Sequence, residues 1–163
     1  MPAKTAQLQV RVTPREKARL RRLADAAGMD LSAYLLARAL PDDAGRVAAL
    51  LQQLATTDAP AFPLAELHDL LVATPAVEFA TLVSAPPPRD LPPWLANYVA
   101  AMVETAASRL GVVPPAWAAD VPPLDTPWFA TPLKALRPWL LRASPVPFRR
   151  RNLFVDTSLG GRA

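Results

Sequence analysis

The chain has 163 residues, a length that suits one domain or two small ones. Its 18 lysine and arginine residues outnumber its 14 aspartate and glutamate residues, which gives a net charge of +4, and the excess lies at the two ends because residues 47–88 contain no basic residue. The absence of cysteine excludes disulfides and thiolate metal sites, and we expect no cofactor. No apolar run is long enough to span a membrane, so we expect a cytoplasmic protein.

The first predicted element is a strand at residues 7–12, where apolar and polar residues alternate so that each set faces one side. The apolar set is Leu8, Val10 and Val12, and the polar set is Gln7, Gln9 and Arg11. The pattern that follows is helical and offers this strand no partner, so we expect it to pair with the same strand of a second copy. The alternative is a half-buried edge strand in an ordinary α/β domain.

Two short helices are predicted directly after the strand. Thr13 and Glu16 have the spacing of a capping box, with a proline preset at the first helical position between them. Gly28 is expected to end the first helix, and Asp30 or Ser32 to cap the second. One strand and two short helices bury too little surface to be stable alone, which again predicts a dimer.

This order of elements, over AQLQVRVTPREKARLRRLADAAGMDLSAYLLARAL at residues 6–40, resembles the ribbon-helix-helix family of DNA-binding proteins, of the Arc and MetJ type. In that family two protomers pair their strands into an antiparallel ribbon that enters the major groove. The resemblance implies a homodimer that binds a double-stranded DNA operator. It places base reading on Gln7, Gln9 and Arg11, and phosphate binding on Leu31, Ser32 and Ala33.

The chemistry of these positions suits DNA independently of the family. Glutamine pairs with adenine edges and arginine with guanine, while the amides at a helix start favour an anion. Lys4 belongs to a basic N-terminal arm that suits a phosphate backbone. Asp30 stands where the family often has serine or threonine, and we expect its charge to weaken the phosphate contact.

The remainder of the chain is predicted to be a series of short helices. Their expected ranges are 44–56, 63–73, 75–83, 93–110 and 132–142. Seventeen of the 20 prolines lie at residue 60 or later, and many follow a residue that can begin a helix. The proposed starts are Phe62-Pro63, Thr74-Pro75, Thr126-Pro127, Thr131-Pro132 and Ser144-Pro145. Pro138 is expected to kink or split the last helix.

The predicted fold class is therefore mainly α. It comprises a ribbon-helix-helix domain for DNA binding and dimerisation at 1–43, a helical connector at 44–88, and a partner-binding domain of helices and extended stretches at 89–163. Pro86-Pro87-Pro88 is the candidate linker between the last two.

Residues 114–163 resemble the C-terminal part of antitoxins that are encoded beside nucleotidyltransferase-fold toxins in bacteria. The motifs that carry this resemblance are Pro-Pro-Ala-Trp, Pro-Trp-Phe, Leu-Arg-Pro-Trp-Leu-Leu and Ser-Pro-x-x-Phe-Arg-Arg-Arg. It implies a toxin-binding surface, and exposed aromatic residues and arginines are typical of such surfaces. The predicted partner-binding residues are Trp128, Phe129, Trp139, Phe148, Arg149, Arg150 and Arg151. The alternatives are that the aromatic residues fill a small core and that the arginines add phosphate contacts.

No catalytic residue is predicted. The five glycines form no phosphate-binding loop. The single histidine, His68, lies near Glu66 and Asp69 on helix positions that do not face one another, so no metal site is expected.

Three classes of function remain. The first is an antitoxin that represses its own operon and neutralises a toxin, the second is a stand-alone repressor, and the third is an accessory protein of plasmid partition or relaxation.

Overall fold

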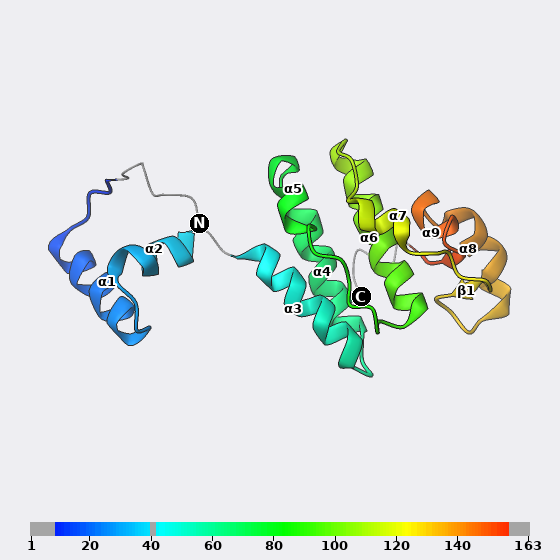
Figure 1. Ribbon diagram of the computed structural model, residues 1–163, viewed down its shortest axis with the longest axis horizontal. Coiled ribbons are helices and arrows are strands. Elements are labelled where there is room, and N and C mark those ends of the chain that lie inside the picture. Colours follow the sequence, from blue (N-terminus) through cyan, green and yellow to red (C-terminus); the bar gives the residue numbers. More distant parts are fainter. Residues whose placement is uncertain (1–8, 40–41, 157–163) are drawn as a thin grey trace. The chain divides into compact units, whose positions relative to one another are not determined.

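The structure of the protein, a computed structural model, describes residues 9–39 and 42–156. They belong to two units, Met1–Asp42 and Asp43–Ala163, and helices dominate both, as the sequence predicted (Figure 1). The elements in chain order are α1 (Pro14–Ala26), α2 (Leu31–Ala39), α3 (Asp43–Thr56), α4 (Ala61–Ala73), α5 (Ala76–Leu82), α6 (Pro93–Leu110), α7 (Ala116–Asp120), β1 (Trp128–Phe129), the 3-10 helix η1 (Lys134–Leu136), α8 (Arg137–Ala143), α9 (Val146–Arg149) and β2 (Leu153–Phe154).

The N-terminal unit is a pair of short helices, and the capping box predicted for the first of them is confirmed. Thr13 caps α1 through a capping box, and the chain turns after α1 at Gly28, whose φ of 65° is in the left-handed region that suits glycine. Residues 9–12 form no strand with any described segment of this chain. Because a ribbon between two copies needs the second copy, the ribbon arrangement stays a prediction.

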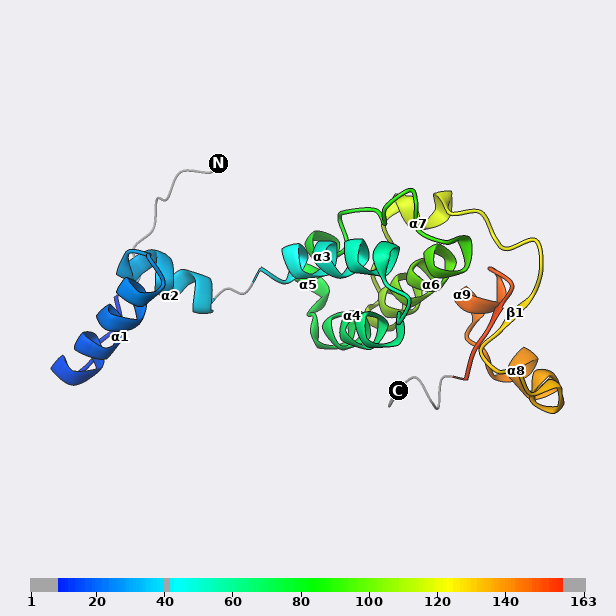
Figure 2. The same cartoon turned by 90° about the horizontal axis from the view of Figure 1, so that it is seen from below.

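The C-terminal unit is built around α6, its longest helix. α4 packs on one side of α6, with α3 against α4, while α9 and β2 pack on α6 from the other side (Figures 1 and 2). Apolar residues at helical spacing fill the centre of α6, including the fully buried Val99 and Val103, and α6 ends at Gly111 with a φ of 67°. The helices predicted at 44–56, 63–73, 75–83 and 93–110 are confirmed as α3 to α6.

The predicted connector at 44–88 and the predicted domain at 89–163 share one hydrophobic core. Val47 and Leu54 of α3 belong to the same buried cluster as Phe148 and Leu153 from the end of the chain. Both segments therefore contribute to a single unit, and the proline run at 86–88 lies within it.

The last part of the chain departs from the prediction at two proposed helix starts: a strand follows Thr126-Pro127, and the helix expected at Thr131-Pro132 begins only at Lys134. Thr126-Pro127 leads into β1, which pairs in parallel with β2 so that Trp128 lies opposite Leu153. The backbone N–H of Trp128 donates to the Asn152 carbonyl at 2.8 Å, so pairing with a distant segment overrides the local helix signal. Pro138 splits the predicted helix at 132–142, as expected, because η1 ends just before α8 and Pro138 lies in the first turn of α8.

None of the helices in the described ranges is both long enough and apolar enough to cross a membrane.

Candidate nucleic-acid interface and partner surface

The capping box of α1 joins Thr13 and Glu16 at the start of the first helix. The backbone N–H and the hydroxyl of Thr13 both donate to the Glu16 carboxylate at 2.8 Å, and the N–H of Glu16 donates to the Thr13 hydroxyl at 3.3 Å. These hydrogen bonds favour the ionised carboxylate and lower the pKa of Glu16 below its usual value. The cap sets the start of α1 directly after residues 9–12.

The predicted base-reading residues are partly within the described structure. Gln9 and Arg11 are both exposed to solvent, whereas Lys4 and Gln7 lie outside the described residues. The intervening Val10 and Val12 are also exposed, at 70% and 43%. Both faces of this segment are therefore open in a single chain, and the face carrying the valines is the one that a second copy would have to cover.

The start of α2 is capped by Asp30, one of the two predicted candidates. Its carboxylate accepts hydrogen bonds from the backbone N–H groups of Ser32 and Ala33, each at 2.9 Å. The family resemblance places phosphate binding at these same two residues, so a phosphate oxygen would compete with the Asp30 carboxylate for their N–H groups. Leu31, the third predicted residue, is half-buried.

The N-terminal unit has almost no core of its own. Among residues 9–39, only Ala24 and Tyr34 are buried. Several large apolar side chains are exposed instead: Val10, Val12, Leu23, Met29, Leu35 and Leu36. So much exposed apolar surface on so few residues is typical of a surface that another chain covers.

Helix α1 is strongly basic. Its exposed cations are Arg15, Lys17, Arg19, Arg21 and Arg22, and none of them forms an ion pair with another described residue. Together with Arg11 they give the unit a positive surface that is available to an anionic partner.

The aromatic residues predicted to bind a partner divide between core and surface. Phe148 is 5% exposed and lies in the core, and Trp128 is stacked on Trp94 with ring centroids 5.2 Å apart. Phe129 stacks on Phe154 at 4.9 Å. Trp139 on α8 is the member of the predicted set that is largely open, at 47% exposure. For Phe148 and Trp128 the alternative of a core role therefore describes the structure better.

The three consecutive arginines, at residues 149–151, also divide between surface and core. Arg149 and Arg150 are exposed, as a partner contact requires, but Arg151 is 5% exposed and its guanidinium lies 2.6 Å from the Glu104 carboxylate of the same chain. The prediction that Arg151 meets acidic groups of a partner is therefore wrong, because a buried cation needs its counter-charge within the fold.

Around the predicted Trp139, Arg149 and Arg150, the structure adds surface residues that sequence reasoning missed. We call residues 133–150 the cationic-apolar segment. Its exposed apolar residues are Leu133, Leu136, Trp139, Leu141 and Val146, and its exposed cations are Lys134, Arg137, Arg142, Arg149 and Arg150. A charge count would have found the segment, since residues 126–155 contain no aspartate or glutamate.

The capped helix pair, its basic first helix and its missing core are together typical of the ribbon-helix-helix class. A comparison with protein families supports such an N-terminus: residues 2–58 match the NikA-like family model, described as mobilization protein NikA. The match covers the N-terminal unit and α3, and it leaves the rest of the C-terminal unit unmatched. Neither the curated proteins nor the solved structures contain a significant match to this chain.

Proposed function

We propose that this protein is a DNA-binding accessory protein of DNA mobilization, which binds double-stranded DNA as a homodimer through its N-terminal unit. The match of residues 2–58 to a mobilization protein family is the observation that carries the proposal. It corresponds to the third class of function that the sequence left open.

The N-terminal unit has the charge and the local geometry that this role needs. The cations of α1 and Arg11 supply attraction to phosphate, while Gln9 and Arg11 are exposed side chains able to bond base edges. The exposed apolar residues beside them supply the dimer contact, since pairing two copies would bury Val10 and Val12.

The family match favours mobilization over the predicted antitoxin role. It names a mobilization protein over the DNA-binding part of the chain, and no comparison associates residues 114–163 with a toxin partner. The antitoxin role therefore has only the sequence motifs behind it, and two of its predicted anchors, Phe148 and Arg151, are buried.

We also propose that the cationic-apolar segment binds an acidic protein. Trp139 is its best apolar anchor, because it is large and nearly half exposed, and Arg149 and Arg150 flank the surface with positive charge. These three residues belong to the seven that the sequence predicted.

The proposal is tested with labelled duplexes that tile the DNA around the protein's own gene, titrated by fluorescence anisotropy. We expect selective binding to a site in an origin-of-transfer region, with affinity that falls steeply as salt rises. Selective binding only to the gene's own promoter would instead identify a stand-alone repressor, and equal binding to all duplexes would contradict sequence recognition.

Two matched double variants locate the DNA contact. The Gln9→Ala/Arg11→Ala variant should lose selectivity, with about 1–3 kcal/mol lost for each good base contact. The Arg149→Ala/Arg150→Ala variant should bind the same duplex like the parent. If the second variant loses DNA binding instead, the cationic-apolar segment is a phosphate contact and the assignment to a protein partner is wrong.

A further inference from the structure

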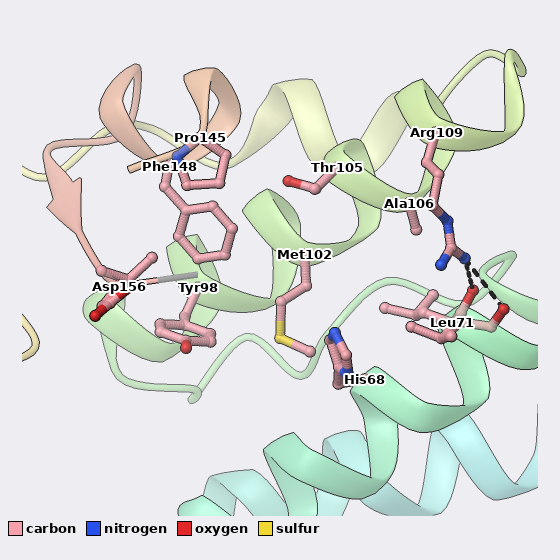
Figure 3. Close-up of a pocket in the computed structure, with 12 residues that line it drawn as sticks. His68, Leu71, Tyr98, Met102, Thr105, Ala106, Arg109, Pro145, Phe148 and Asp156 are labelled. Atoms are coloured by element: carbon pink, nitrogen blue, oxygen red, sulfur yellow. Dashed lines mark hydrogen bonds between the residues drawn. The ribbon is translucent and has the colours of Figure 1, made fainter. Parts of the chain in front are cut away.

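A cavity of about 280 Å³ lies in the C-terminal unit, between α4, α6 and the end of the chain (Figure 3). His68 and Leu71 of α4 form one wall, Met102 of α6 lies at its centre, and Phe148 closes it from the C-terminal side. Its volume is just below the range of about 300–1,000 Å³ that is usual for small-molecule sites. A ligand that fits it must be small.

The cavity has a fixed cation at one end. The Nη2 of Arg109 donates to the carbonyl oxygens of Leu71 and Val72, at 2.9 and 3.2 Å, which holds the guanidinium against the end of α4. The other N–H groups of Arg109 have no partner among the described residues, and its side chain is exposed to solvent. A charge held in place in this way loses little conformational freedom when it binds an anion.

The opposite end of the cavity is lined by residues from α6 and from the end of the chain. Figure 3 shows Asp156 and Tyr98 at the end away from Arg109, with the Met102 side chain between the two ends. An anionic group is attracted to the Arg109 end. This one fixed cation gives a bound anion one orientation.

The walls between the two ends are mainly apolar, with His68 and Thr105 as polar members. Met102, Leu71 and Phe148 are buried residues of the core that also face the cavity. The Tyr98 ring contacts Phe148 edge-on, with centroids 5.2 Å apart, and is itself contacted by Trp128 at 6.3 Å. Such walls accept an apolar body of modest size and disfavour a strongly hydrated ligand such as free phosphate.

We propose that this cavity binds a small amphipathic carboxylate, whose charged group pairs with Arg109 and whose apolar body lies between Met102 and Phe148. A carboxylate matches the planar fork of a guanidinium and carries the single charge that one cation balances. The proposal is independent of the DNA-binding function, because every residue it uses lies in the C-terminal unit.

The test compares three ligands with one apolar body: octanoate, octanol and octylammonium, each titrated into the full chain below its aggregation concentration. The signal is tryptophan fluorescence, since Trp128 contacts the cavity residue Tyr98. We expect saturable binding of octanoate, about tenfold weaker binding of octanol because it lacks the charge-assisted hydrogen bonds, and the weakest binding of octylammonium. Equal affinities for the three, or no saturable binding, would overturn the proposal; the latter would leave the cavity to an apolar side chain of a protein partner.

Variants separate the site from a general effect on the fold. Arg109→Gln should reduce octanoate affinity to that of octanol, Arg109→Lys should retain most of the preference for the anion, and Arg89→Gln, at an exposed arginine away from the cavity, should change nothing. Ala106→Leu, and independently Thr105→Leu, should fill the cavity and abolish binding of all three ligands. Circular dichroism identifies any variant that fails to fold, and octanoate binding to two folded cavity-filling variants at parental affinity would show that the cavity is not the site.

Discussion

The guanidinium of Arg151 lies 2.6 Å from the carboxylate of Glu104. Glu104 belongs to α6, and its side chain is 22% exposed. The same guanidinium donates to the backbone carbonyls of Ala118 and Val121 and to the side chain of Asn97. One buried cation thus joins α6, α7 and the segment that leads to β2. It ties the end of the chain to the central helix of the C-terminal unit.

We expect Arg151→Ala to destabilise the C-terminal unit by about 3–5 kcal/mol, because it leaves the Glu104 carboxylate without its counter-charge. Arg150→Ala, at the exposed neighbour, should change the free energy of unfolding by less than about 0.5 kcal/mol. Urea unfolding followed by tryptophan fluorescence measures this unit alone, since all four tryptophans lie in it. A Glu104→Leu/Arg151→Met variant should recover much of the stability that Arg151→Ala loses. If Arg151→Ala and Arg150→Ala lower the free energy of unfolding equally, the Arg151–Glu104 ion pair has no special role.

The second prediction concerns DNA affinity at the start of α2. Asp30→Asn keeps a good helix cap but removes a negative charge from the amides of Ser32 and Ala33. We expect binding to duplex DNA to become about two- to fivefold tighter, the size of a charge effect at an exposed helix terminus. Asp25→Asn, at an exposed aspartate near the end of α1, is the matched control, measured by anisotropy at the same salt concentration. An equal gain from both variants would mean that only net charge matters.

The third prediction concerns pH. The pKa of Glu16 is lowered in the folded state by hydrogen bonds from Thr13, so the cap contributes stability above the usual carboxyl pKa and this contribution is lost as pH falls through the lowered value. We expect the far-UV helical signal of the parent to fall in acid more than that of Glu16→Gln, whose cap has no charge to lose. The matched control is Asp25→Asn, which should follow the parent. Superimposable acid titrations of the parent and Glu16→Gln would contradict a role for the ionised cap.

The features that could be predicted from the sequence are the local ones. The cap at Thr13, the helix at 93–110 and the split at Pro138 each depend on residues that are near one another in the chain, and the structure confirms all three. The pairing of Trp128 with Leu153 joins distant residues over only two positions, which leaves no periodic pattern to detect.

The parts of the site that could not be predicted depend on tertiary contacts. Arg151 was assigned to a partner because its counter-charge, Glu104, lies 47 residues earlier in the chain. The cavity draws His68, Arg109 and Asp156 from three separate segments, and no sequence spacing connects them. The ribbon predicted at residues 7–12 would need a second chain, so it stays a prediction.

The last prediction tests the dimer. Val10 is 70% exposed and Val12 is 43% exposed in the single chain, so a ribbon between two copies would bury both valines in each copy. Burial of each side chain contributes about 1.5–3 kcal/mol, and a charge placed there would be buried without a partner. We expect Val10→Asp to convert a dimer into a monomer, measured by light scattering, and to abolish DNA binding with it. Val77→Asp provides the control, because Val77 on α5 is 87% exposed in the other unit and should tolerate the charge. A Val10→Asp variant that remains dimeric and binds DNA like the parent would show that residues 9–12 do not form the ribbon.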